Sequence, residues 1–480
     1  MKEKIIRNYL YSLVYQVLTV LVPLVTTSYI SRILTSSEIG LYDYSLTICT
    51  YFTFVASAGI PILAQKEIVL HEEDVSECFS YYFLLRFTLT SIVCCLYCAF
   101  ACFFDNRFIF LGQGIGLLAT GFDISWYYSG KENFKAITNR NVFFKIVSII
   151  FLFAFVKGKN ALLLYTLSIA IPNLIGNILL FWKLDVKIIR PTITCFDVVR
   201  TLKTSLVLLI PSLVLQLYSI VDKTILGTFS TLSELGYYAQ AFKLVNVLTL
   251  ASTTLGTVIF PQMVRTYNEN IKEMCRLTSK SLDVIIHLFF LPVFGIAACA
   301  DIFAEWFYGS NYIGIENLLV LTMPIVIFKA LNYVTANQAL IASNREKSLI
   351  LIICSGTILN CILDVLLVRT YGARGAIGAT AISEFFILLV SMRLIKRKEG
   401  NIRLINTDNI RATIAAVIEY GGIVATKRFL INRIDNALVA TFLMGCFGFV
   451  LYTVSLKILK DNYYLEAKKM LMNYIRRREK

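Results

Sequence analysis

The chain has 480 residues, of which 57% are apolar and only 16% are charged, and its mean hydropathy is +0.70. A soluble domain carries roughly 25% charged residues, so this composition excludes a soluble protein and predicts one whose apolar side chains face lipid. The net charge of +15 does not indicate nucleic acid, because the excess is spread along one membrane face and the basic C-terminal stretch; attraction to anionic lipid explains it.

Fourteen apolar runs predict membrane-spanning helices. Such a helix needs about 20 mostly apolar residues, because it rises 1.5 Å per residue through a hydrocarbon core of about 30 Å. The first run is too long for the core of a cleavable signal peptide, so we expect it to stay as a span. In chain order the runs are residues 9–31, 40–63, 79–103, 108–129, 142–156, 161–182, 204–227, 236–262, 282–300, 317–342, 348–368, 375–394, 412–426 and 435–456.

The charges of the predicted loops give an orientation. Lysines and arginines concentrate in the loops on the side that holds both termini, and such an excess is typical of the cytoplasmic side. The acidic loop after the second run, with Glu67, Asp74 and Glu77, is the exception, but acidic residues carry little weight in this rule. We therefore expect a multi-pass protein of the cytoplasmic (inner) membrane with both termini in the cytoplasm.

An internal repeat divides the chain. The segment Ser37-Glu38-Ile39-Gly40-Leu41-Tyr42 returns 196 residues later as Ser233-Glu234-Leu235-Gly236-Tyr237-Tyr238. In both copies, Ser and Glu suit the N-terminus of a helix. Six predicted spans separate the copies, so the repeat is parallel, with a pseudo-twofold axis along the membrane normal.

This repeat predicts an all-α protein of two six-helix lobes and two additional helices. Residues 1–192 would form the N-lobe with spans 1 to 6, and residues 193–398 the C-lobe with spans 7 to 12. Residues 399–480 would add spans 13 and 14 and a basic cytoplasmic tail. The mid-helix prolines Pro23 and Pro211 occupy the first helix of each lobe, where they permit bending.

Ionisable residues inside the predicted spans mark the candidate site. A charge in hydrocarbon costs about 2.5 to 3.5 kcal/mol on insertion scales, so it usually faces a bundle interior or a water-filled cavity. Lys329 and Glu384 lie deepest, whereas Lys145 is near enough to a membrane surface to reach it. The residues of this kind are Arg86, Asp123, Lys145, Lys243, His287, Lys329, Asp364, Glu384 and Glu419.

Two interpretations of these residues stay open. Arg86 and Lys243, one in each lobe and both about 12 Å deep, could share a cationic cavity that suits a phosphate or an acidic sugar. The alternative is internal ion pairing, of Arg86 with Asp123 or of Lys329 with Glu384. The candidate substrate-cavity residues are Arg86, Lys243, Lys329, Asp123, Glu384, Gln16 and Gln240; the two amides suit either a hydroxyl-rich cargo or contacts between helices.

Several patterns of catalysis are missing from the sequence. It contains no Walker A segment, no nucleophile arrangement and no metal-ligand cluster. Cys94, Cys98 and Cys102 share one helical face without a histidine or carboxylate, so packing explains them. We expect a transport protein without catalytic residues, metal or cofactor.

Four segments carry a resemblance to a known family. They are residues 23–42 (PLVTTSYISRILTSSEIGLY), 122–135 (FDISWYYSGKENFK), 222–238 (DKTILGTFSTLSELGYY) and 372–384 (GARGAIGATAISE). The chain resembles the Wzx-type flippases of polysaccharide biosynthesis, within the multidrug/oligosaccharidyl-lipid/polysaccharide exporter superfamily. The motif residues are Arg32, Glu38, Gly40, Tyr42, Trp126, Gly130, Glu132, Asp222, Gly236 and Tyr238.

The resemblance implies a flippase for undecaprenyl-diphosphate-linked oligosaccharide repeat units, which serve surface polysaccharides such as O-antigen or capsule. The glycan would cross in a central cavity by alternating access, driven by an ion gradient or by consumption downstream. Partners would be the lipid-linked oligosaccharide, membrane lipids, and a polysaccharide polymerase with its assembly enzymes, but no nucleic acid. We expect a monomer.

Two other functions remain as alternatives. A cation-coupled drug or metabolite exporter of the same superfamily would share the lobed fold. A membrane glycan polymerase or ligase would need a sizeable external loop with basic catalytic residues, and the loops at residues 228–235 and 301–316 are short for that purpose.

Overall fold

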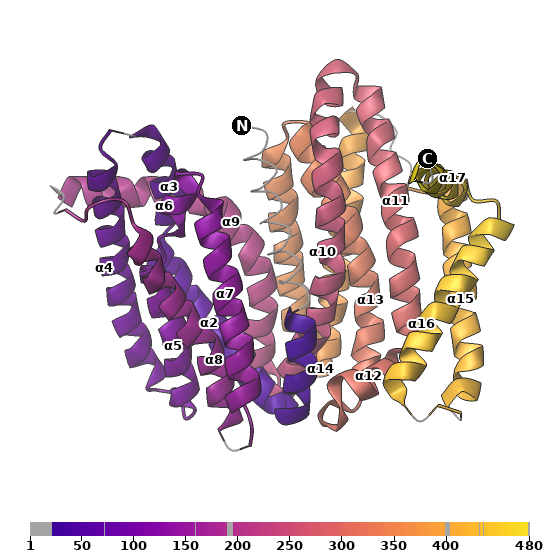
Figure 1. The fold of residues 1–480 in the computed structure, drawn as a ribbon, viewed down its shortest axis with the longest axis horizontal. Coiled ribbons are helices and arrows are strands. Elements are labelled where there is room, and N and C mark those ends of the chain that lie inside the picture. The colour runs from indigo at the N-terminus through magenta and orange to yellow at the C-terminus, as the bar shows by residue number, and fades with distance from the viewer. Residues whose placement is uncertain are drawn as a thin grey trace. The chain divides into compact units, whose positions relative to one another are not determined.

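The computed structural model describes residues 22–71, 73–158, 160–189, 195–398, 404–431, 433–434 and 436–478. In these residues the regular structure is helical, and no strand occurs among them (Figure 1). The predicted all-α class is therefore confirmed. Contacts divide the chain into an N-terminal unit, Met1–Gly236, and a C-terminal unit, Tyr237–Lys480; the lobe boundaries at residues 192 and 398 stay predictions.

Helices of the N-terminal unit follow one another with short connections. Residues 22–33 are helical before a break at residues 34–35. The labelled helices are α2 (Ser36–Ser57), α3 (Ile60–Leu70), α4 (Val75–Ala101), α5 (Arg107–Gly121), α6 (Ser125–Gly130), α7 (Phe134–Phe155), α8 (Ala161–Leu179), the 3₁₀ turn η1 (Leu180–Lys183) and α9 (Cys195–Phe229).

The C-terminal unit takes up the chain within α10. Its elements are α10 (Leu232–Glu269), α11 (Ile271–Ala298), α12 (Ala300–Tyr308), the 3₁₀ turn η2 (Ser310–Tyr312), α13 (Ile315–Asn332), the π-helical η3 (Tyr333–Leu340), α14 (Glu346–Lys398), α15 (Thr407–Ile431), α16 (Ala437–Ile458) and α17 (Asn462–Arg478).

Nine helical stretches of the described chain are long and apolar enough to span a membrane, so the multi-pass prediction is confirmed, while the count of fourteen stays a prediction. Two predicted spans, 348–368 and 375–394, fall in the single stretch Glu346–Lys396. That stretch is interrupted at Gly372, whose φ of 54° and ψ of −132° are not helical. Glycine reaches this conformation without a steric penalty, so the chain can turn there between two helices.

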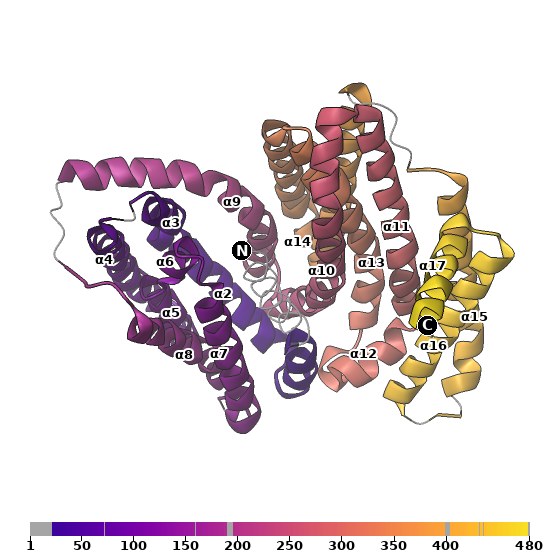
Figure 2. The same ribbon diagram turned by 45° about the horizontal axis from the view of Figure 1, so that its top comes forward.

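α9 crosses the ends of its neighbours. Figure 2 shows it as a long, curved helix that passes α3 and α4. A side chain on Gly59, at the start of α3, would place its Cβ 2.1 Å from the carbonyl oxygen of Ser205 in α9. The Tyr81 hydroxyl of α4 is hydrogen-bonded to the Thr201 hydroxyl at 2.9 Å. The first part of α9 is thus fixed against the ends of α3 and α4.

Both copies of the sequence repeat begin a helix, as predicted. Thr35 caps α2, and its hydroxyl accepts from the backbone N–H of Glu38, whose carboxylate accepts from the Thr35 N–H in return. At the start of α10 the Thr231 hydroxyl accepts from the N–H of Glu234 at 3.2 Å. Thr35 and Glu38 correspond to Thr231 and Glu234 at the repeat offset, so the repeat is a repeat of helix caps.

The two caps also lie against each other. A Cβ on Gly40 would meet the carbonyl oxygen of Leu232 at 1.7 Å, and one on Gly236 would meet that of Ser36 at 1.9 Å. Because Gly236 is the counterpart of Gly40 and Leu232 that of Ser36, the contact is reciprocal, which is the mark of a twofold arrangement. Only glycine at both positions lets the backbones approach so closely.

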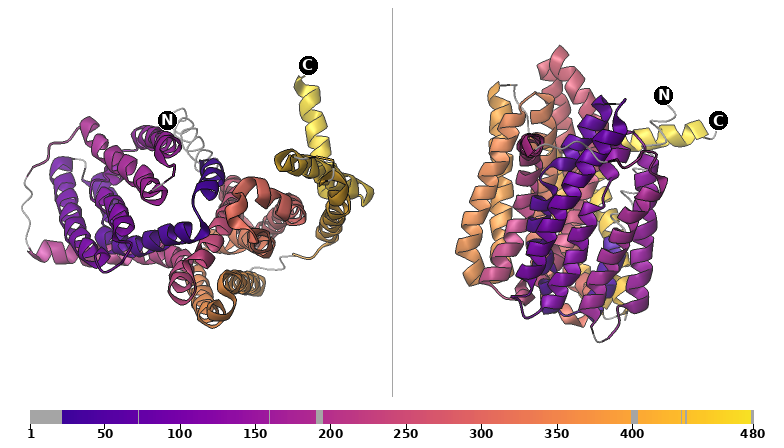
Figure 3. Two further views of the ribbon diagram at one scale, coloured as in Figure 1. Left: turned by 90° about the horizontal axis from the view of Figure 1, so that it is seen from below. Right: turned by 90° about the vertical axis from the view of Figure 1, so that its left-hand side faces the viewer.

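The C-terminal helix is tied to the bundle by polar groups. His287 Nε2 of α11 lies 3.1 Å from Asp461, and the Tyr463 hydroxyl donates to Asp283 at 2.6 Å. Burial disfavours ionised Asp461, but hydrogen bonds from His287 and the Tyr464 N–H hold the pKa of Asp461 below its usual value. The right-hand view of Figure 3 shows α17 lying across the direction of the bundle helices.

We predict that Gly40→Ala and Gly236→Ala each destabilise the protein. The added methyl group must push two backbones apart, and overpacking of this kind costs about 1–3 kcal/mol. Thermal unfolding in detergent would measure the loss. The control is Gly116→Ala in α5, where a Cβ meets nothing within 4 Å. Equal unfolding temperatures for all three variants and the wild type would contradict the tight crossing.

Candidate functional site

Arg86 of α4 is buried, with 5% of its surface exposed. Its Nη1 donates to the backbone carbonyl of Asp123, just beyond α5, at 2.5 Å. The guanidinium therefore binds a main-chain oxygen at the junction of α5 and α6. The predicted candidates Arg86 and Asp123 are brought together, although through the backbone of Asp123.

The carboxylate of Asp123 belongs to a wider polar network. Its Oδ1 accepts from the N–H of Ser125 at 2.9 Å and lies 3.9 Å from Arg140 Nη2. Arg140 also donates to the Ser125 hydroxyl at 2.8 Å and to the side chain of Asn177. This network joins α6, α7 and α8. Arg140 was not identified from the sequence as the cation beside Asp123, because packing of separate helices brings the two residues together.

In the C-terminal unit, Lys329 and Glu384 form an ion pair. Lys329 Nζ of α13 lies 3.8 Å from Glu384 Oε1 of α14 and 5.8 Å from the centre of the Phe242 ring. Asn332, one turn further along the chain, donates to the carboxylate of Glu384 at 2.8 Å. The internal pairing that the sequence left open is present for these two residues.

The other candidates differ in their surroundings. Gln240 is fully buried and donates to the Tyr312 hydroxyl at 3.5 Å, while its backbone carbonyl accepts from Tyr308. It therefore links α10 to α12 and η2. Lys243 is half-buried in α10. Gln16 lies outside the described residues.

A buried ion pair that the sequence did not predict lies beside the glycine crossing. Lys223 Nζ of α9 lies 2.5 Å from Oδ1 of Asp43 in α2, and only 5% of the Asp43 side chain is exposed. About two turns along α2 from Asp43, Tyr51 is hydrogen-bonded at 2.9 Å to Thr224, the chain neighbour of Lys223. Lys223 lies in the resemblance segment 222–238, and Asp43 directly follows the segment 23–42. Opposite charges at these two places were the sequence signal for the pair.

Asn360 and Asp364 form a second polar pair; the sequence named Asp364 among the charges inside the predicted spans, but it did not predict the pairing. They lie one turn apart in α14, both fully buried, and the Asn360 amide donates to the Asp364 carboxylate at 3.2 Å. Their spacing of four residues, which brings two side chains onto one helical face, was the available signal.

Most of the family-motif residues have packing roles. Trp126 is buried and stacks on Phe79 with ring centres 5.4 Å apart. A Cβ on Gly130 would lie 2.9 Å from the Ile68 side chain, so α6 packs closely on α3. Tyr42 packs on Tyr165 at 4.6 Å and Tyr238 on Phe242 at 4.2 Å. Asp222 is buried, whereas Arg32 and Glu132 are exposed.

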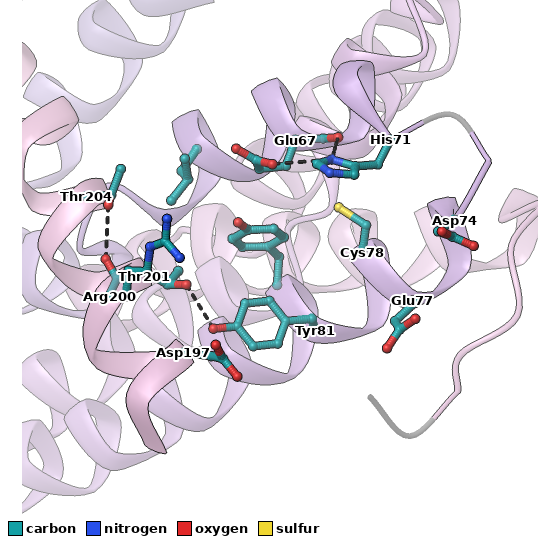
Figure 4. Close-up of a pocket in the computed structure, with 12 residues that line it drawn as sticks. Glu67, His71, Asp74, Glu77, Cys78, Tyr81, Asp197, Arg200, Thr201 and Thr204 are labelled. Atoms are coloured by element: carbon teal, nitrogen blue, oxygen red, sulfur yellow. Dashed lines mark hydrogen bonds and ion pairs between the residues drawn. The ribbon is translucent and has the colours of Figure 1, made fainter. Parts of the chain in front are cut away.

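A cavity of about 550 Å³ lies among the ends of α3, α4 and α9. Four carboxylates line it, those of Glu67, Asp74, Glu77 and Asp197, together with one arginine, Arg200, which lies in Figure 4 on the side away from Asp74 and Glu77. These include the acidic residues that depart from the charge rule. With four carboxylates and one arginine, plus His71, the lining is unsuited to a phosphate.

Solved structures of other membrane proteins have the same fold as this chain. The structure shares its fold with a lipid II flippase MurJ in an inward closed conformation, at a TM-score of 0.69 and 14% identity, over 95% of this chain and 99% of that one. An inward-facing multidrug resistance MATE family transporter matches at a TM-score of 0.62 and 12% identity, over 81% and 98%. The chain thus has the fold of a multi-pass membrane transporter.

The particular family follows from the sequence comparison. A model described as polysaccharide biosynthesis protein matches residues 5–267. The chain belongs to this family, which confirms the resemblance found in its motifs.

Three curated relatives are 20% to 28% identical to the chain over the matched residues. A Haloferax volcanii protein named "Probable low-salt glycan biosynthesis flippase" is 28% identical over 35% of this chain, and the lipid II flippase MurJ of Bacillus subtilis is 26% identical over 39%. The chain covers only 35% and 37% of the length of these two proteins. An Escherichia coli K12 protein named "Putative O-antigen transporter" is 20% identical over 82% of this chain and 97% of its own length.

We predict strong coupling between Asp43 and Lys223. Lys223→Met leaves a buried carboxylate without its cation, which should cost up to about 3 kcal/mol, the lower end for a buried pair because Lys223 is partly exposed. Adding Asp43→Asn should recover part of that loss. Unfolding temperatures of the two single variants and the double variant give the coupling, with Lys272→Met, an exposed lysine, as the control. If the losses of stability in the two single variants add up to the loss in the double variant, the ion pair does not contribute to the stability of the protein.

Proposed function

We propose that the chain is a flippase that moves lipid-linked glycan from one leaflet of the membrane to the other. The observation that carries this proposal is the family match over residues 5–267. The transporter fold and the names of the relatives, a glycan flippase, a lipid II flippase and an O-antigen transporter, support it.

The finer proposal concerns the cargo and the location. It is an undecaprenyl-diphosphate-linked oligosaccharide repeat unit for a surface polysaccharide such as O-antigen or capsule. The protein lies in the cytoplasmic membrane with both termini in the cytoplasm, as its loop charges favour. The diphosphate is the part of this cargo that needs cations, and the sugars need hydrogen-bonding groups.

We propose movement by alternating access, in which the two predicted lobes rock against each other as in other transporters built from parallel repeats. The sequence repeat that contains Gly40 and Gly236 supports this proposal. Arg86, Lys243 and Lys329 remain the proposed cations of the cargo path. Arg86 and Lys329 contact Asp123 and Glu384. Lys243 is half-buried in α10, and it is the residue chosen for substitution.

Leaflet-resolved labelling of lipid-linked glycan in cells tests the function. In cells that lack the protein, a membrane-impermeant reagent should label little glycan at the outer leaflet, while the glycan accumulates on the cytoplasmic leaflet. Restoring the protein should reverse both effects. Unchanged glycan labelling together with increased drug sensitivity would overturn the proposal in favour of an exporter.

For the cargo path we predict that Lys243→Gln lowers export about tenfold while the protein accumulates normally. A charge-assisted hydrogen bond is worth about 1.5–3 kcal/mol, and 1.4 kcal/mol corresponds to a factor of ten. The same leaflet labelling measures the rate. Lys280→Gln, an exposed lysine of α11, is the matched control. Full export by Lys243→Gln would remove this residue from the cargo path.

A further inference from the structure

A second cavity, in the N-terminal unit, has the opposite charge to the acidic one. It measures about 410 Å³ and lies where α6, α7, α8 and η1 come together. Three cations line it, Lys135, Arg140 and Lys183, together with the amides of Asn133 and Asn139. No carboxylate is among the described residues of its lining. Such a set of donors suits an anion.

The start of α7 adds to this positive character. Asn133 caps the helix and accepts from the N–H of Ala136, so the N-terminal end of a 22-residue helix, with its partial positive charge, belongs to the cavity wall. Arg140 is held in place by Asn177 and Ser125. Lys135 and Lys183 are exposed, so their ammonium groups can reach a ligand from water or from the membrane surface.

The rest of the cavity is apolar and leads to a lipid-facing surface. Phe143, Phe144 and Leu179 line it. From Phe143 an exposed stripe continues along α7 through Ile146 and Ile150, which are 59%, 45% and 62% exposed, and α8, which packs on α7, exposes apolar side chains beside it. In a multi-pass membrane protein such a stripe meets acyl chains.

An exposed tryptophan marks the level of the membrane surface. Trp182 in η1 is 85% exposed and directly precedes Lys183. Tryptophan gathers where headgroups meet hydrocarbon, and basic residues at that level attract anionic lipid. Trp182 is thus the chain neighbour of one of the cations that line the cavity.

We propose that this cavity binds an anionic phospholipid. Lys135 and Lys183 contact the headgroup phosphate, the start of α7 and Arg140 complete its positive surroundings, and the acyl chains lie along the stripe on α7. The loops that carry the cavity fall on the side that the charge rule predicts to be cytoplasmic, where anionic lipid is enriched. The proposal does not depend on the identity of the transported cargo.

Trp182 supplies the test. The full-length protein is placed in phosphatidylcholine vesicles that contain a small fraction of phospholipid brominated on its acyl chains, which quenches nearby tryptophan. The signal of Trp182 is the difference between the wild type and Trp182→Phe. We expect brominated phosphatidylglycerol to quench it severalfold more effectively than brominated phosphatidylcholine, since each lysine near an anionic headgroup contributes roughly fivefold in binding.

Paired variants decide whether the cavity is responsible. Lys135→Gln with Lys183→Gln should bring the preference for phosphatidylglycerol close to one, and Lys135→Arg with Lys183→Arg should keep it. The matched control is Lys131→Gln with Lys187→Gln, two exposed lysines of the same loops outside the lining. Unfolding temperatures equal to that of the wild type establish that the variants are folded.

Three results would overturn the proposal. Equal quenching by the two brominated lipids in the wild type would exclude a selective site. An equal loss in the control pair would assign the selectivity to general surface charge. Displacement of phosphatidylglycerol by a few per cent of undecaprenyl diphosphate, with no displacement by unlabelled phosphatidylglycerol at the same level, would make the cavity a site for the diphosphate lipid instead.

Discussion

The close crossing of two helix starts at Gly40 and Gly236 is the constraint on which the rest of the structure depends. Each glycine faces a backbone carbonyl at a distance that no side chain permits, and each belongs to one copy of the repeated segment. Around this contact, α2 and α9 are held together by the Asp43–Lys223 pair and the Tyr51–Thr224 hydrogen bond. The two copies of a sequence repeat thus meet in a reciprocal contact within the N-terminal unit.

The low dielectric of the membrane explains why so many polar groups are paired. Arg140 with Asp123, Lys329 with Glu384 and Lys223 with Asp43 each place opposite charges within 4 Å, because an isolated charge in hydrocarbon is costly. Two cavities of the N-terminal unit gather charges of one sign. One is lined mainly by carboxylates and the other by cations, so the N-terminal unit offers two chemically distinct surfaces to water and headgroups.

Hydropathy and periodicity were sufficient to predict the all-α membrane class, because the bilayer imposes about 20 apolar residues on every span. The repeat and its role at helix N-termini could also be predicted from the sequence, since Ser, Thr and Glu side chains hydrogen-bond the backbone N–H groups at the start of a helix. Pairings across helices were harder. Arg140 and Lys223 acquire their partners only through packing, and the charges of the Lys329–Glu384 pair could equally have faced a cavity. Span depth alone could not separate these outcomes, because it says how far a residue lies from the surface but not which neighbour it faces.

Transport by the purified protein is the most direct test of the account. The protein would be reconstituted into vesicles with fluorescent undecaprenyl-diphosphate-linked oligosaccharide, and the fraction of glycan accessible to an impermeant reagent would be followed with time. We expect the wild type to expose glycan from the inner leaflet much faster than protein-free vesicles do. Equal rates with and without protein would contradict the function.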